Sequence, residues 1–309
     1  MIDPPEKSRD SNQSSLDRAI DQRVHCIVCN SVMSAQQSWL YKCNSCGFRS
    51  STLNSGAGRG VDGLNNLRKK NYRTILNHIQ QYKSLNGLHL LEVGCAEGWF
   101  LEEAKRRGLT TLGIEPSSKH ANIARAKGFK VIQDFFPNDK VKNSQFDCLI
   151  FNDVFEHLPN PVEALQACEE LLVPGGLLII NLPSSNGFFY RLAELMQNLG
   201  NTKLMQRLWQ VGLPSPHLSY FNASTLNKLI VGYSSLHRID QFKLDSLNPK
   251  GMAQRIHKSE MVRKMAFVFE VVTAVALPVL RILPSDIIVG IFKKPECDGQ
   301  KITAKATDY

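Results

Sequence analysis

The sequence has no hydrophobic run long enough to make a membrane-spanning helix, and it has no internal repeat. Its most anchor-like segment, residues 247–284, contains at most ten consecutive residues without a charge, 271–280, whereas a span needs about 20 apolar residues. Residues 1–21 are polar and lack the apolar core of a secretory signal peptide. These absences argue against an integral membrane protein or a secreted protein, so we expect a cytoplasmic location.

An excess of acidic residues is also absent. The chain carries 37 Lys and Arg against 28 Asp and Glu, a formal net charge of +9, which favours an anionic partner such as a phosphorylated substrate, a nucleic acid or a membrane surface. The basic residues do not form one dense patch interleaved with aromatic residues, as a nucleic-acid-binding surface would require. With 43% hydrophobic and 21% charged residues, the composition is that of a globular protein.

Four of the eight cysteines form two C-x-x-C pairs, Cys26 with Cys29 and Cys43 with Cys46, with thirteen residues between the pairs. Two such pairs can close a tetrahedral site for Zn²⁺. A stretch this short cannot build a core of its own, so the metal would supply its stability. Four thiolates leave no open coordination position, which predicts a structural zinc. The adjacent His25 is therefore not expected to bind the metal. The other four cysteines are scattered and are expected to be reduced thiols.

The most informative stretch, residues 88–107, indicates a strand, a tight turn and a helix. Leu88–Val93 is largely apolar, as in a strand buried on both faces of a parallel sheet. Small residues follow, Gly94-Cys95-Ala96-Glu97-Gly98, and then a helical pattern with basic residues at its end. This is the opening of a nucleotide-binding βαβ unit, but the turn lacks the G-x-G-x-x-G spacing of dinucleotide-binding proteins.

Further motifs occur in order after this unit. A second apolar strand ends in Glu115-Pro116, where a carboxylate can bind both ribose hydroxyls of a nucleoside. Another strand ends in Asp134-Phe135, an acidic residue followed by an aromatic one. A third, residues 146–152, leads into Asp153-Val154-Phe155-Glu156-His157-Leu158. The last, residues 171–180, contains a Pro-Gly-Gly turn.

Together these motifs resemble those of the class I S-adenosylmethionine (SAM) methyltransferases, in the branch that contains ubiquinone-pathway O-methyltransferases and many sugar-modifying methyltransferases. The resemblance covers about two thirds of the chain. It implies an α/β fold with a Rossmann-like, mostly parallel seven-stranded sheet whose last strand is antiparallel, to which the small zinc ribbon is added. It also implies SAM as cofactor. The residues it places at the cofactor are Glu92, Gly94, Cys95, Ala96, Gly98, Glu115, Pro116, Asp134, Phe135, Asn152, Asp153 and Val154, with Glu92 expected to accept loop amides rather than to bind SAM directly.

The predicted organisation is a disordered tail over 1–23, the zinc ribbon over 24–50, a linker over 51–63 and the methyltransferase domain over 64–309. Within the domain, the long irregular segment 183–221 is expected to bind the acceptor, because such segments at the carboxyl ends of parallel strands form substrate loops. Apolar patterns predict helices over 64–85, 116–127, 161–172, 192–199 and 224–231, and late strands over 236–244 and 286–292. Segment 247–284 is basic, then apolar, and fits a helix packed on the domain, a homodimer contact, or an interfacial helix at the inner face of a membrane.

Methyl transfer to a hydroxyl needs a proton acceptor. His157, in the Glu-His-Leu pattern that resembles the family's, and His217, in the predicted acceptor segment, are the candidate bases, although both also fit structural roles. No cluster of metal ligands is apparent near the predicted cleft, which argues against a metal-dependent mechanism. The predicted acceptor is a glycan, a lipid-linked molecule or a small molecule. The alternatives are a zinc-ribbon protein that binds RNA, as a modifying enzyme or an adaptor, and a quinone-type methyltransferase at a membrane surface.

Overall fold

The computed structural model describes residues 24–54, 56, 65–246 and 284–296. The predicted disordered tail, most of the predicted linker and all of the 247–284 segment except residue 284 therefore lie outside the described residues. Among the helices that the structure describes, none combines the length and apolar character needed to cross a bilayer.

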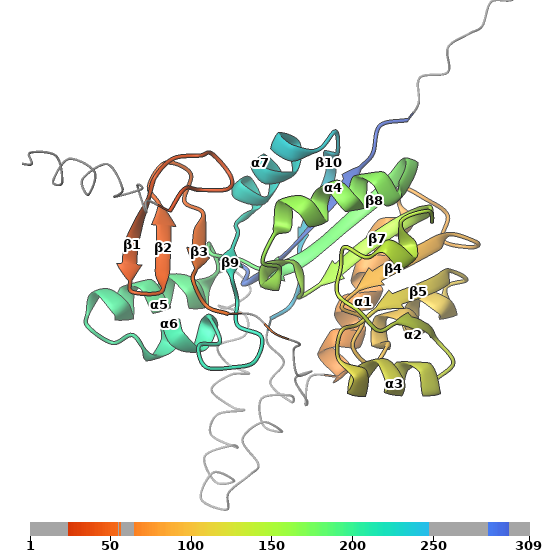
Figure 1. Ribbon diagram of the computed structural model, residues 1–309, viewed down its shortest axis with the longest axis horizontal. Coiled ribbons are helices and arrows are strands. Elements are labelled where there is room, and N and C mark those ends of the chain that lie inside the picture. Colours follow the sequence, from red (N-terminus) through yellow and green to blue (C-terminus); the bar gives the residue numbers. More distant parts are fainter. Residues whose placement is uncertain (1–23, 55, 57–64, 247–283, 297–309) are drawn as a thin grey trace, which may run out of the picture.

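A seven-stranded sheet forms the centre of the larger part of the molecule (Figure 1). Its strand order is β10-β11-β8-β7-β4-β5-β6. Strand β11 runs antiparallel to both of its neighbours, and the other pairings in the sheet are parallel. The predicted sheet with an antiparallel last strand is thus confirmed. The strands are β4 (His89–Val93), β5 (Thr110–Ile114), β6 (Lys130–Ile132), β7 (Phe146–Asn152), β8 (Leu172–Pro183), β10 (His237–Lys243) and β11 (Ile287–Lys293).

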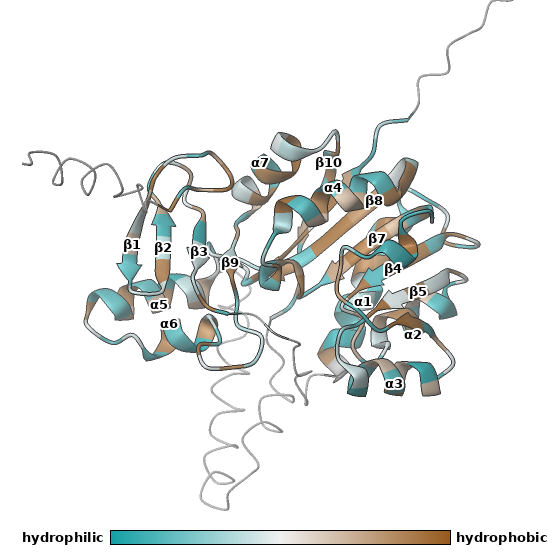
Figure 2. Cartoon of the chain, in the orientation of Figure 1, coloured by the Kyte–Doolittle hydropathy of each residue, from teal (hydrophilic) through white to brown (hydrophobic). Residues whose placement is uncertain are grey.

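Both faces of the central strands are buried, which explains why they are hydrophobic almost throughout (Figure 2). Successive residues alternate between two cores: Leu91 packs on one face with helices α4 and α7, and Leu90 on the other with α1, α2 and α3. Burying one such side chain contributes roughly 1.5–3 kcal/mol. The helices are α1 (Asn65–Gln80), α2 (Trp99–Arg106), α3 (Ser118–Ala126), α4 (Pro161–Leu171) and α7 (Ala223–Tyr233), with the 3₁₀ turns η1 (Asp139–Val141) and η2 (Phe155–His157).

The predicted elements of this part are found with small differences at their ends. Helix α1 ends at Gln80, five residues before the predicted end, and the backbone continues as a turn. The first helix of the predicted acceptor segment, α5 (Phe188–Asn198), begins four residues earlier than expected, because Asp286 from the other end of the fold accepts a hydrogen bond from the Phe189 N–H at 2.8 Å. Helix α6 (Lys203–Leu208) and strand β9 (Ser219–Tyr220) were not predicted.

The cysteine-containing region forms a second sheet, and this sheet includes a strand from the larger part of the molecule. Its order is β1 (Met33–Gln37), β2 (Leu40–Cys43), β3 (Arg49–Ser51) and then β9. Arg49 pairs with Tyr220 in the β3–β9 ladder, and the rings of Phe48 and Phe221 lie 5.0 Å apart. In Figure 1 this sheet stands beside the ends of the large sheet, with α5 and α6 beneath it.

The ribbon is therefore joined to the acceptor segment by a shared sheet and a shared core, and it is more than a module on a linker. Cys26, Cys43 and Phe48 belong to the same buried cluster as Phe155 and Phe221. The structure also moves one boundary, because Ser51 belongs to strand β3 and not to the predicted linker.

Candidate functional site

The predicted cofactor residues converge at the carboxyl ends of β4, β5 and β7. These three strands are adjacent and parallel, with Glu92 of β4 in register with Gly113 of β5 and Ile150 of β7. The residues that follow each strand therefore meet at one edge of the sheet, as they do at the ligand-binding crevice of open α/β sheets.

The turn between β4 and α2 has a conformation that favours small residues. Gly94 and Gly98 have φ angles of 70° and 78°, and Ala96, which carries a side chain, has a φ angle of 45°. A Cβ atom added to Gly94 would lie 2.5 Å from Cγ2 of Val154. Gly94, one of the residues expected at the cofactor, therefore makes room for Val154, which is itself a predicted cofactor residue. Non-glycine residues with positive φ often mark functional sites.

Glu115 holds this turn in place. Its Oε2 accepts a hydrogen bond from the Ala96 N–H at 2.9 Å, and its Oε1 accepts one from the Ser117 N–H, also at 2.9 Å. The residue is buried. Each carboxylate oxygen can accept a further hydrogen bond, so Glu115 can organise the loop and still bind two ribose hydroxyls.

Glu92 has a different partner from the loop amides we expected. Its Oε1 accepts a hydrogen bond from Asn152 Nδ2 at 3.0 Å, across the β4–β7 pair. Its Oε2 is buried and has no partner in the described part of the chain, and the same is true of Asn152 Oδ1. Burial raises the pKa of Glu92 to about 8. The cationic α-amino group of SAM would give these buried oxygens a donor and favour the ionised form of Glu92, so the residues present fit this cofactor.

The predicted adenine residues lie at the end of β6 and are accessible. Phe135 exposes 60% of its surface, which leaves its ring available for stacking. Hydrogen bonds from Asn138, Lys140 and the Phe135 N–H lower the pKa of Asp134, which stays ionised as an acceptor.

The remaining predicted cofactor residues lie at the same edge. Pro116 lies at the end of β5, and Asp153 follows β7 with a φ angle of 54°. Cys95 is buried under the turn, and burial raises the pKa of its thiol, so it is not a reactive thiolate.

The two candidate bases, far apart in sequence, lie together. The ring centroids of His157, in η2, and His217, before β9, are 4.7 Å apart. His157 Nδ1 lies 2.8 Å from the Pro216 carbonyl oxygen, which can only accept, so Nδ1 carries the proton and Nε2 keeps its lone pair. His157 Nε2 is 4.0 Å from Oε1 of Glu156, which exceeds hydrogen-bond distance.

His217 is held more tightly than His157. It is buried, its Nε2 lies 2.9 Å from Gln210 Nε2, and its Nδ1 has no partner among the described residues. Burial and the neighbouring His157 lower the pKa of His217 well below its ordinary value, and burial lowers the pKa of His157. Both imidazoles are therefore neutral at neutral pH. Burial and the Asp153 carboxylate raise the pKa of Glu156 well above its usual range.

Sequence reasoning missed Glu156 as a member of this cluster. One ligand-type atom from each of Glu156, His157 and His217 lies within 4.8 Å of the others, and one carboxylate with two imidazoles is a donor set that also suits a divalent cation. The expectation that no such grouping lies near the cleft is therefore wrong. The Glu-His pair was visible in sequence, but its third member is sixty residues away and is brought in by the fold.

A basic residue of α1 also lies near the β4–α2 turn. The guanidinium of Arg68 lies over the Trp99 ring at the start of α2, 5.2 Å from its centroid. Arg68 is thus a basic residue of α1 that lies beside the start of α2.

The four predicted metal ligands form a compact cluster. Cys26 Sγ lies 3.5 Å from Cys46 Sγ, and Cys29 Sγ lies 3.5 Å from Cys43 Sγ, with all four sulfur atoms within 4.8 Å of one another. A tetrahedral zinc with bonds of about 2.3 Å requires separations of about 3.8 Å. Burial raises the pKa of Cys46 to about 11, a penalty that a bound cation would offset. His25 hydrogen-bonds to the Asn30 carbonyl and lies outside the cluster.

Comparisons with known proteins identify the family of residues 64–232. A family model described as a methyltransferase domain matches residues 64–232. The ubiquinone biosynthesis O-methyltransferase of Actinobacillus pleuropneumoniae is 30% identical over 139 residues, which cover 41% of this chain and 56% of that protein. The mitochondrial ubiquinone biosynthesis O-methyltransferase of Rattus norvegicus is 30% identical over 136 residues, 41% of this chain and 39% of that protein. The chain thus spans about half the length, or less, of these curated relatives.

Among solved structures, the cyclopropane synthase MmaA2 of Mycobacterium tuberculosis matches with a TM-score of 0.54 and 15% sequence identity, covering 78% of this chain and 90% of that chain. At this identity the similarity concerns the fold alone.

Proposed function

Since the chain belongs to the methyltransferase-domain family, we propose that it transfers a methyl group from SAM to a hydroxyl group of an acceptor. The observation that carries the hydroxyl assignment is the neutral His157, whose Nε2 has a free lone pair directly after the cofactor-binding end of β7. The relatives named as O-methyltransferases support the same reaction.

The cofactor supplies an activated methyl group on a sulfonium, and the protein aligns it with the acceptor and excludes water. Glu115 would bind the ribose hydroxyls while it holds the Ala96 N–H. Phe135 and Asp134 would meet the face and the edge of the adenine. The orphaned oxygen of Glu92 and the guanidinium of Arg68 would bind the amino and carboxylate groups of the methionine portion.

His157 would take the hydroxyl proton on Nε2 as the acceptor oxygen forms its bond to the methyl carbon and the carbon–sulfur bond breaks. The hydrogen bond from Nδ1 to the Pro216 carbonyl fixes the ring and its tautomer. His217 is a positioning residue in this scheme, because its Nε2 is occupied by Gln210 and the residue is buried.

The four cysteines would hold one structural Zn²⁺, which connects β2 and β3 to the loop before β1. Through the β3–β9 ladder, the metal would also help to position His217, because β9 begins two residues after it.

Carbon-labelled SAM tests the reaction class. The protein is incubated with SAM carrying a ¹³C-methyl group and with a panel of phenol, catechol and methyl glycosides, and the product is observed by NMR. We expect a methoxy signal together with release of S-adenosylhomocysteine. A methyl signal on nitrogen or carbon would contradict the hydroxyl assignment.

Glu115→Ala is expected to weaken SAM binding. The change removes the acceptor for two ribose hydroxyls and for two loop amides, a loss of roughly 1–3 kcal/mol, or about 5- to 150-fold in the dissociation constant. Calorimetric titration with SAM measures it. Glu102→Ala is the control, since Glu102 pairs with Arg106 on the surface of α2. Equal affinities in the folded Glu115→Ala variant and the wild type would remove Glu115 from the site.

The pH dependence of kcat/KM is expected to show an acid limb with a midpoint below about 6.5, the ordinary pKa of histidine. A histidine base works only when neutral, and burial lowers the pKa of His157, so the rate should fall to half of its plateau only at a pH below 6.5. The pH profile of a His157→Gln variant should lack this acid limb. A limb centred at or above 6.5 would contradict a buried neutral base.

A divalent cation on Glu156, His157 and His217 is the alternative to base catalysis. Brief treatment with EDTA, with the ribbon zinc monitored by elemental analysis, separates the two. We expect unchanged turnover. A loss that Mg²⁺ or Mn²⁺ restores would replace the base by a metal.

A further inference from the structure

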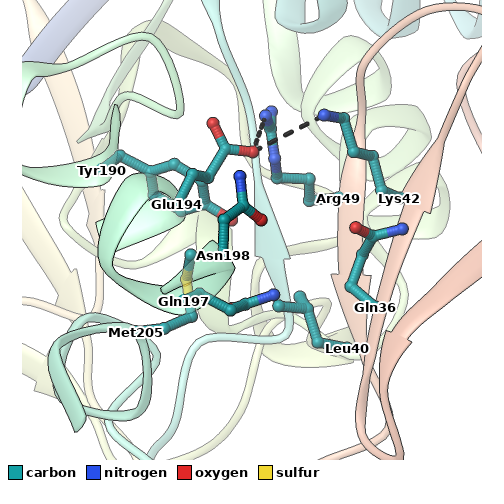
Figure 3. A pocket seen from close by; sticks show the side chains of 9 residues that line it. All are labelled: Gln36, Leu40, Lys42, Arg49, Tyr190, Glu194, Gln197, Asn198 and Met205. Atoms are coloured by element: carbon teal, nitrogen blue, oxygen red, sulfur yellow. Dashed lines mark hydrogen bonds and ion pairs between the residues drawn. The ribbon is translucent and has the colours of Figure 1, made fainter. Parts of the chain in front are cut away.

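A cavity of about 180 Å³ lies between the ribbon sheet and helices α5 and α6, apart from the cofactor cleft. One wall comes from β1, β2 and β3 and the other from α5 and α6 (Figure 3). Neither the proposed cofactor site nor the histidine pair uses the residues that line it.

Three charged groups form the upper end of the cavity in Figure 3. Glu194 of α5 lies 2.5 Å from the guanidinium of Arg49 and 3.6 Å from Lys42 Nζ. Arg49 is 7% exposed, donates a second hydrogen bond to the Gly47 carbonyl, and lies over the Tyr190 ring. The ion pair is therefore held in a fixed geometry by groups from both walls.

The remainder of the lining combines amides with an apolar floor. Gln36, Gln197 and Asn198 bring amide groups that can both donate and accept. Leu40 and Met205 are fully buried apolar side chains at the lower end.

These groups select a class of ligand. An anion would be repelled by the Glu194 carboxylate, with which both cations are already paired. A cation would be repelled by Lys42 and Arg49. A wholly apolar ligand would shield the charged groups and amides from water without pairing their remaining donors and acceptors, which costs about 1–3 kcal/mol for each unpaired group. A neutral polyhydroxylated ring suits the lining, because its hydroxyls can donate to Glu194 and accept from Lys42 or from an amide.

We propose that this cavity binds a sugar unit of the methyl acceptor, so that the ribbon is an acceptor-recognition element. The volume fits one monosaccharide. The proposal rests on the proposed function, because the bound sugar belongs to the molecule that is methylated.

A chain of rings connects the cavity with the histidine pair. Tyr190, in its wall, lies 4.7 Å from the Tyr220 ring, and Tyr220 lies 5.1 Å from the His217 ring. A sugar in the cavity would therefore contact one side of this row of rings, and the reacting hydroxyl would lie on the other side, near His157. The sugar and the hydroxyl would belong to different units of the same acceptor molecule.

Saturation-transfer NMR tests binding without any need for turnover. The full-length protein, saturated with S-adenosylhomocysteine, is mixed with the methyl glycosides of glucose, galactose, mannose, rhamnose, fucose and N-acetylglucosamine. We expect transfer to at least one of them, with binding about ten-fold weaker in Glu194→Gln and in the double variant Gln36→Ala, Asn198→Ala. Gln206→Ala, an exposed amide on α6 outside the lining, should bind as the wild type does.

The double variant changes only exposed side chains, so it keeps the test valid if Glu194→Gln fails to fold. Absence of transfer to every glycoside in the wild type, or equal transfer in the double variant, would overturn the proposal, as would inorganic phosphate displacing the bound sugar. The ¹³C-methyl assay decides the proposed function separately: methylation of catechol without any sugar binding would leave the reaction standing and remove the sugar site.

Discussion

His157→Ala is expected to lower turnover by about 10²- to 10⁴-fold, the range in which a positioned general base contributes, while SAM affinity stays near that of the wild type. The base acts on the acceptor, and SAM would be held by residues of β4, β5 and β7, so only the chemical step should suffer. The His157 side chain is 18% exposed, so circular dichroism first establishes that the variant is folded. Single-turnover kinetics with the acceptor found in the ¹³C assay measure the effect.

Added imidazole provides a readout that a structural role would not produce. If His157 takes the proton, free imidazole should restore part of the rate in His157→Ala. His237→Ala, which changes an exposed histidine at the start of β10, should retain full turnover. His217→Gln should have a smaller effect than His157→Ala, because His217 positions its neighbour. A variant His157→Ala that keeps more than about a tenth of the rate, well above what loss of a base allows, would exclude His157 as the base.

Cys43→Ser is expected to remove the zinc and to lower methyl transfer by at least about 100-fold, since misplacement of binding groups by even 1 Å can cost this much. Cys43 is fully buried, and its loss would break the proposed metal site. Structural zinc contributes about 10–16 kcal/mol of binding energy to small zinc-finger peptides. Strand β3 then loses its support, and β9 loses its partner. SAM binding should persist, because the large sheet has its own core.

Elemental analysis and hydrogen exchange measure these effects together. We expect one zinc per chain in the wild type and none in the variant, with faster exchange in residues 24–51 and also in 217–222. His25→Asn is the matched control, because His25 adjoins Cys26 but bonds to the Asn30 carbonyl. Faster exchange confined to 24–51, with full methyl transfer, would contradict the link between the ribbon and the acceptor segment.

Local patterns in the sequence predicted the large sheet and the cofactor edge. Continuous apolar strands such as 146–152 are read correctly because both faces of a parallel sheet are buried, and parallel strands bring their carboxyl ends to one edge. Glu115 and Asn152 could thus be placed together although they are far apart in the chain. The cysteine cluster was equally readable, since two C-x-x-C pairs at this spacing match the ligand pattern of zinc sites.

The features of the acceptor side could not be read in this way. Strand β9 has two residues, too few to show any periodicity, and its pairing with β3 joins positions about 170 residues apart. The partner of Glu92 depended on the register of two strands, because Asn152 reaches it across the sheet.

The sequence by itself determined the strands, the edge at which β4, β5 and β7 end, and the spacing of the four thiols, because each is encoded in neighbouring residues or in the parallel order of strands. Only the tertiary structure decided that His217 contacts His157, that Glu156 joins them, and that Arg49 and Glu194 close a cavity between the ribbon and α5. These contacts form when distant segments pack against one another, and the free energy of that packing belongs to the pair of surfaces rather than to either stretch of sequence.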